Sequence, residues 1–259
     1  MKRGYADTPE GQVHYRTEGN GETLLLLHKA GLSSDEFTEM LPFLGKNYRA
    51  IAMDVLGYGN TDLPKPEPKF NDYVRNIVHF IDAMKLKKIN IAGHLLGGSF
   101  GMEIAATHPE LVNKLILWDG IFLDEVERKA TQEEYANEHM ILKDDGTHML
   151  EVWKSRGGKP GANLLSVNRS TIEYLKSGLG EGTGASHRAL FSYNPESQLP
   201  KIKAPTLLLY SSPKSPMLVR VDAMKAAIIN SEVKILNGVN PWEKPGELAR
   251  VMIDFLNSK

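Results

Sequence analysis

The sequence predicts an α/β fold: a mostly parallel central sheet flanked by helices, with a helical lid inserted late in the chain. Apolar runs of strand length alternate with helical stretches over residues 1–120 and again over 201–259, a pattern typical of parallel strands joined by crossover helices. Residues 121–200 are rich in charge and lack strand signals. We therefore expect one core built from 1–120 and 201–259, and a lid formed by 121–200.

The elements of the core follow one another in alternation. Residues 3–17 are expected to form a hairpin, with TPEGQ as its turn. The first part of the core then has predicted strands at 23–28, 49–57, 88–93 and 114–119, and predicted helices at 35–44, 70–86 and 100–108. The second part has predicted strands at 204–212 and 232–238, and predicted helices at 217–229 and 246–256. Within the lid, we expect helices around 124–156 and 170–179, separated by glycine-rich joints at 157–161 and 178–184.

Composition excludes several classes of function. The formal net charge is −1, so the chain offers no basic field for nucleic acid or an anionic membrane. The absence of cysteine excludes disulfides, thiolate metal sites and thiol nucleophiles. No apolar run approaches the roughly 18 residues that a membrane-spanning helix needs. We expect a cytoplasmic protein without metal or cofactor that binds a hydrophobic small molecule; the oligomeric state stays open.

Five motifs occur in the order typical of one family. They are LLLLHKAG at 24–31, DVLGYGNTD at 54–62, GHLLGG at 93–98, APTLLLY at 204–210 and NGVNPWEKPGELARVMIDFL at 237–256. In this order the chain resembles the esterase-like, lid-bearing members of the α/β-hydrolase superfamily, over nearly its whole length. The third motif resembles the nucleophile elbow, where a serine stands on a sharp strand-to-helix turn.

The resemblance implies a Ser-His-Asp triad, but this sequence differs at each position. Leu95 stands where the elbow has serine, Lys214 aligns with the acid, and Asn240 aligns with the histidine. No histidine follows residue 187, and neither Asp nor Glu occurs within residues 211–220. Without a hydroxyl, a base and an acid, hydrolysis by a triad is not expected. Because the changes fall where a pocket is expected and the surrounding pattern is kept, we interpret the chain as an engineered scaffold.

Lys29 stands where the family's oxyanion-hole loop has glycine. A lysine amine is almost wholly protonated in water, with a pKa of about 10.4, but an apolar pocket disfavours the charged form. A neutral amine adds to ketones and forms a Schiff base, which permits carbon–carbon cleavage. We therefore predict Lys29 as a catalytic amine in retro-aldol cleavage of a hydrophobic β-hydroxy ketone. The predicted substrate-binding residues around it are Leu95, Asn240, His28, Ala30 and Leu96.

A second hypothesis is an inactive pseudo-hydrolase, or an inactivated esterase, that only binds apolar small molecules. Other reactive side chains near the motifs are expected to be structural. His94 is expected to be a hydrogen-bonding core histidine, and Asp119 a carboxylate satisfied by backbone amides. Ser99, Ser211 and Ser212 are ordinary hydroxyls, because no base is expected beside them.

Overall fold

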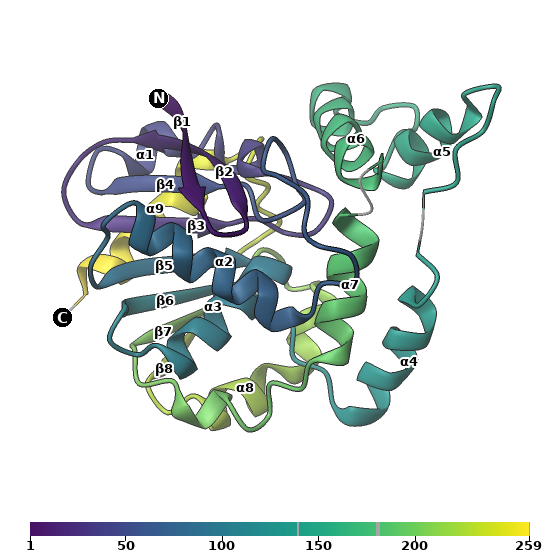
Figure 1. The fold of residues 1–259 in the computed structure, drawn as a ribbon. Coiled ribbons are helices and arrows are strands. Elements are labelled where there is room, and N and C mark those ends of the chain that lie inside the picture. Colours follow the sequence, from purple (N-terminus) through teal and green to yellow (C-terminus); the bar gives the residue numbers. More distant parts are fainter. Residues whose placement is uncertain (139, 180–181, 259) are drawn as a thin grey trace.

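A computed structural model describes residues 1–138, 140–179 and 182–258. Within these residues, eight strands form one sheet in the order β1-β2-β4-β3-β5-β6-β7-β8 (Figure 1). The strands are β1 (Lys2–Thr8), β2 (Gly11–Glu18), β3 (Thr23–Leu27), β4 (Arg49–Met53), β5 (Ile89–His94), β6 (Val112–Trp118), β7 (Thr206–Tyr210) and β8 (Ser231–Ile235). β2 pairs antiparallel with both β1 and β4, and all other pairs are parallel. The predictions of a mostly parallel sheet and of an N-terminal hairpin are confirmed.

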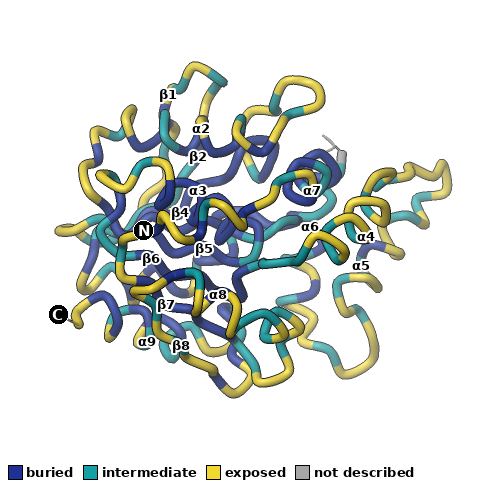
Figure 2. Tube along the Cα trace, turned by 90° about the horizontal axis from the view of Figure 1, so that it is seen from below, coloured by how far each residue is buried: buried dark blue, intermediate teal, exposed yellow. Residues whose placement is uncertain are grey.

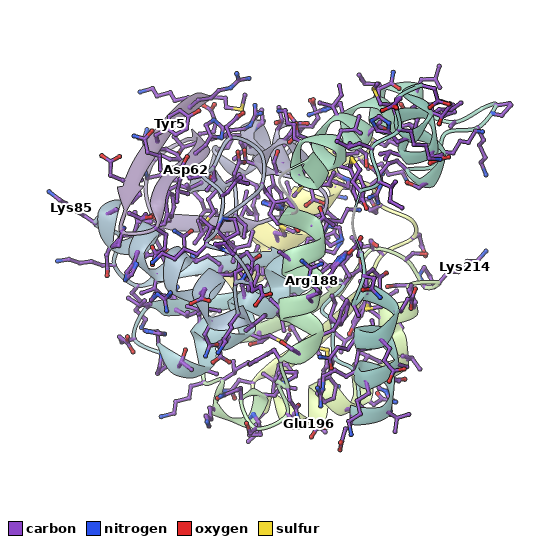
Figure 3. All side chains as sticks on the ribbon, turned by 45° about the vertical axis from the view of Figure 1, so that its right-hand side comes forward. Tyr5, Asp62, Lys85, Arg188, Glu196 and Lys214 are labelled. Carbon is purple, nitrogen blue, oxygen red and sulfur yellow. The ribbon has the colours of Figure 1, made fainter. Side chains whose placement is uncertain are left out.

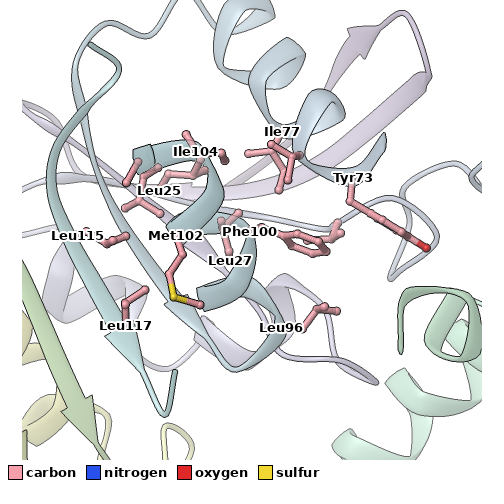
Figure 4. Packing of buried hydrophobic residues seen from close by; sticks show 14 of the residues in the cluster. Leu25, Leu27, Tyr73, Ile77, Leu96, Phe100, Met102, Ile104, Leu115 and Leu117 are labelled. Atoms are coloured by element: carbon pink, nitrogen blue, oxygen red, sulfur yellow. The ribbon is translucent and has the colours of Figure 1, made fainter. Parts of the chain in front are cut away.

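Helices cover both faces of the sheet because its central strands are apolar on both sides. Leu25 and Leu27 of β3 belong to a buried apolar cluster that also includes residues of α2 (Phe70–Ala83), α3 (Leu96–Thr107) and α8 (Val221–Ala227), and Figure 4 shows part of this cluster. Leu24 and Leu26 of the same strand face the other cluster, with α1 (Leu41–Leu44) and α9 (Pro245–Asn257). All four leucines have no exposed surface, and Figure 2 shows the central strands as the buried centre of the molecule. Continuous apolar strands are what a sheet covered on both faces requires.

Two predicted helices differ from the structure. The stretch predicted as one helix over 35–44 is a 3₁₀ turn, η1 (Ser34–Phe37), followed by the short α1. Pro42 has no N–H to donate to the preceding turn, and it lies in the first turn of α1, where no such bond is needed. The stretch predicted as one helix over 217–229 likewise begins as a 3₁₀ turn, η3 (Pro216–Arg220), before α8.

Four helices occupy the described residues between β6 and β7, and no strand interrupts them there. They are α4 (Glu125–Tyr135), α5 (Thr147–Ser155), α6 (Leu164–Leu179) and α7 (Gly182–Ser192). We call residues 121–200 the insertion; its action as a lid stays a prediction. α7 begins inside the joint expected at 178–184, and residues 180–181 of that joint lie outside the described residues. A Cβ on Gly182 would lie 2.2 Å from the carbonyl oxygen of Gly57, so this glycine permits close contact with the core.

A charged contact joins the insertion to the core. The guanidinium of Arg169 on α6 donates from Nε to Asp35 (2.9 Å) and from Nη1 to Glu39 (2.9 Å). The same group lies over the indole of Trp242, 5.3 Å from the ring centroid. Because Asp35, Glu39 and Trp242 all belong to the core, Arg169 helps to fix α6 above the sheet.

In the described ranges, no helix combines the length and the apolar character needed to cross a bilayer.

Candidate functional site

The turn between β5 and α3 consists of Leu95 alone. Its backbone has φ 46° and ψ −109°, a conformation that non-glycine residues rarely adopt and that typically costs about 1–3 kcal/mol. The turn is possible because Gly97 packs against the end of β3, where a Cβ would lie 2.2 Å from the carbonyl oxygen of Leu27. The Leu95 amide donates to the carbonyl of Trp118 (2.9 Å). The fold therefore holds a leucine side chain at the tip of a sharp strand-to-helix turn.

A cavity of about 420 Å³ lies beside this tip, between the core and the insertion. The core wall is formed by Lys29, Ala30, Leu95, Leu96 and Ile121. Four of the predicted site residues thus share one wall. The insertion contributes the remaining wall, which includes Tyr135, Glu138, Arg156, Tyr174, His187 and Phe191. Since three of these can carry charge, the cavity is not the purely apolar pocket expected from the sequence.

Lys29 is partly buried, and its backbone is held on both sides. Its amide donates to Glu36 Oε2 (3.1 Å), and its carbonyl accepts from His28 Nδ1 (2.8 Å). No partner for the Lys29 amine is found among the described residues. Burial acts to raise the pKa of Glu36, but the paired His94 and the charge of Lys29 hold it below its ordinary value. Glu36 is therefore an anion near Lys29.

His28 and Asn240 do not line the cavity. His28 is fully buried and uses both ring nitrogens, because its Nε2 accepts from the amide of Val55 (3.0 Å). Burial lowers the pKa of His28, which keeps the ring neutral. The side-chain oxygen of Asn240 accepts from the amide of Trp242 (2.8 Å), closing a local turn. His28 and Asn240, both predicted to bind substrate, therefore stabilise loops through hydrogen bonds.

Beneath the elbow lies a buried network centred on His94. Its Nδ1 lies 2.6 Å from Glu36 Oε1, and its Nε2 lies 3.8 Å from Asp119 Oδ2. The carboxylate of Asp119 accepts from the hydroxyls of Ser211 (2.6 Å) and Ser215 (2.7 Å). The sequence led us to expect backbone amides as its main partners; hydroxyls supply these close contacts instead. The network joins the loop after β7 to the loop after β3.

The other side chains considered from the sequence lie apart from an imidazole base. Lys214 is exposed and projects away from the protein body (Figure 3). Ser212 accepts from the Lys214 amide (3.1 Å). Ser99 on α3 is buried, and its hydroxyl has no hydrogen-bonding partner in the described part of the chain. None of these hydroxyls is placed for activation by a histidine.

Sequence reasoning missed the residues that the insertion brings to the cavity. Glu138, Arg156 and His187 belong to no motif, and Glu138 and His187 are 49 positions apart, so no local spacing could pair them. The one available signal was the presence of His187 in a segment expected to cover the strand ends.

Within residues 1–138, 140–179 and 182–258, no group of three or more His, Asp or Glu side chains is placed to hold a metal ion.

The fold agrees with comparisons to known proteins. A family model described as alpha/beta hydrolase fold matches residues 22–238, and the chain belongs to this family. It is 34% identical over 271 residues to the 2-hydroxy-6-oxo-6-(2'-aminophenyl)hexa-2,4-dienoic acid hydrolase of Metapseudomonas resinovorans, covering 96% of this chain and 88% of the relative. It is 22% identical to the 2-hydroxy-6-oxononadienedioate/2-hydroxy-6-oxononatrienedioate hydrolase of Paraburkholderia xenovorans (strain LB400), covering 95% and 91%.

Solved structures show the same fold. A hydrolase from Pseudomonas aeruginosa PA01 aligns with a TM-score of 0.82 at 18% identity, covering 99% of each chain. A serine hydrolase involved in carbazole degradation, the CarC enzyme, aligns with a TM-score of 0.74 at 24% identity, covering 98% of each chain. At these identities the likeness is one of fold.

Proposed function

We propose that this member of the family lacks triad hydrolysis and that its cavity binds a ketone, which reacts with the amine of Lys29. The reaction we propose is retro-aldol cleavage of a hydrophobic β-hydroxy ketone. One observation carries the proposal: Lys29 and Leu95 line the same wall of the cavity. At the position of the elbow nucleophile a ligand therefore meets an apolar side chain, with a primary amine on the neighbouring loop.

The proposed chemistry requires no group from outside the chain except water. The neutral Nζ of Lys29 adds to the ketone carbon. The carbonyl oxygen takes one proton from the amine and one from solvent and leaves as water, which gives an iminium ion. The bond between the α and β carbons then breaks, and its electron pair forms an enamine. The β-hydroxyl loses its proton and becomes an aldehyde. Protonation of the enamine carbon and hydrolysis by water release the second ketone and restore the amine.

The relatives support a carbonyl compound as the ligand. The relative from Metapseudomonas resinovorans is named for a substrate with a 6-oxo group and an aminophenyl ring. Such a ring suits the apolar side chains of the cavity, among them Leu95, Leu96 and Phe191. Of the four positions that differ from the family pattern, 29, 95, 214 and 240, only Lys29 and Leu95 line the cavity. The proposal uses these two residues alone and does not depend on an engineered origin.

A second candidate function is binding without catalysis. It is favoured by the ionisable side chains of Glu138, Arg156 and His187 in the cavity lining, because the proposed amine chemistry calls for apolar surroundings. In that case the chain is an inactive relative of hydrolases. Its cavity would hold a small molecule between the apolar elbow wall and the charged residues of the insertion.

Trapping with borohydride separates the two candidates. The protein is incubated with 4-hydroxy-4-(2-naphthyl)butan-2-one, reduced, digested and mapped by mass spectrometry. We expect one adduct, on Lys29, that is absent from Lys29→Met and kept in Lys214→Met, which removes an exposed lysine. Unmodified Lys29, or labelling spread over surface lysines, would favour binding alone. Turnover of an activated aryl ester at a rate typical of serine esterases would contradict both candidates.

A further inference from the structure

The insertion presents an imidazole paired with a carboxylate to the cavity. Nδ1 of His187 on α7 lies 2.5 Å from Oε2 of Glu138, and both side chains line the cavity that Lys29 and Leu95 also line. The side chains are 18% and 22% exposed, so the pair is largely shielded from solvent while still reaching the cavity. The family motifs do not include either residue.

The pairing fixes which nitrogen of His187 is available. An ionised carboxylate only accepts hydrogen bonds, so Nδ1 carries the proton and the neutral ring keeps a lone pair on Nε2. Among the described residues Nε2 has no partner. The ring is held by Tyr135, edge-on at 4.7 Å, and the second oxygen of Glu138 accepts from Tyr174 (3.3 Å).

Other charged and titratable residues surround the pair formed by His187 and Glu138. Burial raises the pKa of both Tyr135 and Tyr174, so these phenols stay protonated. The guanidinium of Arg156 lies over the ring of Tyr174, 4.8 Å from its centroid. Arg188 donates to the backbone carbonyl of Glu138 (3.2 Å), and Lys29 lines the same cavity from the core. In this setting Glu138 is the carboxylate that contacts the imidazole directly.

We propose that His187 is the general base of the reaction proposed above, on which this inference rests, and that Glu138 is its positioning residue. When the bond between the α and β carbons breaks, the β-hydroxyl proton passes to Nε2 of His187. The imidazolium formed is stabilised by Glu138. The proton later returns to the enamine carbon or to water, which restores the neutral ring. Lys29 thus acts on the ketone from the core, while His187 acts on the hydroxyl from the insertion.

The test combines borohydride trapping with kinetics of naphthaldehyde release from 4-hydroxy-4-(2-naphthyl)butan-2-one. We expect His187→Gln to keep the trapped Lys29 adduct but to lose about 100-fold in kcat, the usual size of a general-base contribution. The decline of kcat on the acidic side should disappear in this variant. Glu138→Gln should lose less activity and shift that decline to lower pH, because a neutral amide leaves the imidazole a weaker base. The control, His148→Gln, removes an insertion histidine that does not line the cavity.

The outcomes distinguish the inference from the proposed function. A wild-type protein that forms the Lys29 adduct, together with unchanged kcat and pH dependence in His187→Gln, would overturn the general-base role and leave the amine intact. An adduct without any aldehyde release would overturn the cleavage step of the proposed function and, with it, this inference. Absence of the wild-type adduct would overturn the proposed function and, with it, this inference.

Discussion

The imidazole of His94 lies flat against the indole of Trp118, with ring centroids 3.8 Å apart and planes 6° apart. The stack leaves both nitrogens of His94 at the ring edge, where they face Glu36 and Asp119. An aromatic wall and a carboxylate pair therefore hold one histidine directly beneath the elbow. Residue 94 immediately precedes Leu95, so this contact also anchors the turn.

His94→Phe tests how strongly the network supports the fold. Phenylalanine keeps the stack on Trp118 but leaves the buried Glu36 without the imidazole that is hydrogen-bonded to it. We expect a loss of about 3–5 kcal/mol in the free energy of unfolding, measured by urea denaturation. Removing the charge as well, in Glu36→Gln/His94→Phe, should recover part of this loss. A change below about 1 kcal/mol in the single variant would contradict a structural role for the pair.

Asp54 makes stability depend on pH in a defined direction. Burial acts to raise its pKa, but hydrogen bonds from His14, Ser34 and Asn60 hold it below its ordinary value. Its contribution is therefore fully present above the unfolded-state pKa of about 3.9 and is lost as the pH falls through the lower folded value. Urea midpoints measured from pH 7 to pH 3 should decline steeply below about pH 4.

Asp54→Asn provides the comparison. This variant should be less stable at pH 7 by about 3 kcal/mol, because a neutral amide cannot replace the anion. It should also show a shallower decline on acidification. Parallel curves for the two proteins would assign the acid sensitivity to other carboxylates, with Glu36 as the next to test.

Leu95→Ser restores a hydroxyl at the elbow but no histidine at position 240. We expect hydrolysis of p-nitrophenyl acetate to stay within a few-fold of the parent protein, because a serine nucleophile needs a base held in hydrogen-bond contact with it, and the imidazole of the cavity, His187, is paired with Glu138 on the insertion. Leu95→Ser/Asn240→His should not recover activity either, because position 240 closes its own turn and does not line the cavity. A burst of p-nitrophenol from either variant would show that a base reaches position 95.

Two glycines of α3 form a matched pair for testing the close packing of the elbow. A Cβ on Gly97 would lie 2.2 Å from the backbone oxygen of Leu27, which cannot yield without moving β3. On Gly101 the nearest atoms are side-chain methyl groups of Ile91 and Leu115, at 3.2 and 3.3 Å. We expect Gly97→Ala to lose more than about 3 kcal/mol of stability, and Gly101→Ala to stay within about 1 kcal/mol. Thermal unfolding of both variants measures the difference, and equal effects would contradict this account.

The sheet and its flanking helices could be predicted because their signals are local. The run TLLLL of β3 is apolar after Thr23, and the small residues that a strand-to-helix turn needs stand on both sides of it, as Gly93 near the end of β5 and Gly97 in α3. The splitting of the stretch 35–44 was missed because its helical spacing continues across Pro42. Proline ends the regular spacing of backbone hydrogen bonds without interrupting the apolar pattern.

The candidate site could be predicted only for its core wall. Lys29, Ala30, Leu95 and Leu96 follow two neighbouring parallel strands, so their convergence follows from sheet topology. The opposite wall depends on how α5, α6 and α7 pack over the strand ends, and that packing is set by contacts distant in sequence. The role of Asn240 was predicted from the alignment alone. Asparagine side chains often accept a hydrogen bond from the backbone amide two residues later, as Asn240 does from Trp242, and this preference is a local turn signal.

The unusual backbone at position 95 is imposed by the sheet, the helix and the glycines around it, and the side chain contributes little to it. A single-residue exchange there would therefore display a different functional group at the same point in the cavity, on an unchanged frame. In evolutionary terms, the distance between a catalytic and a non-catalytic form of this scaffold is short at this position. The longer step is the acquisition of a partner group able to move a proton to or from it.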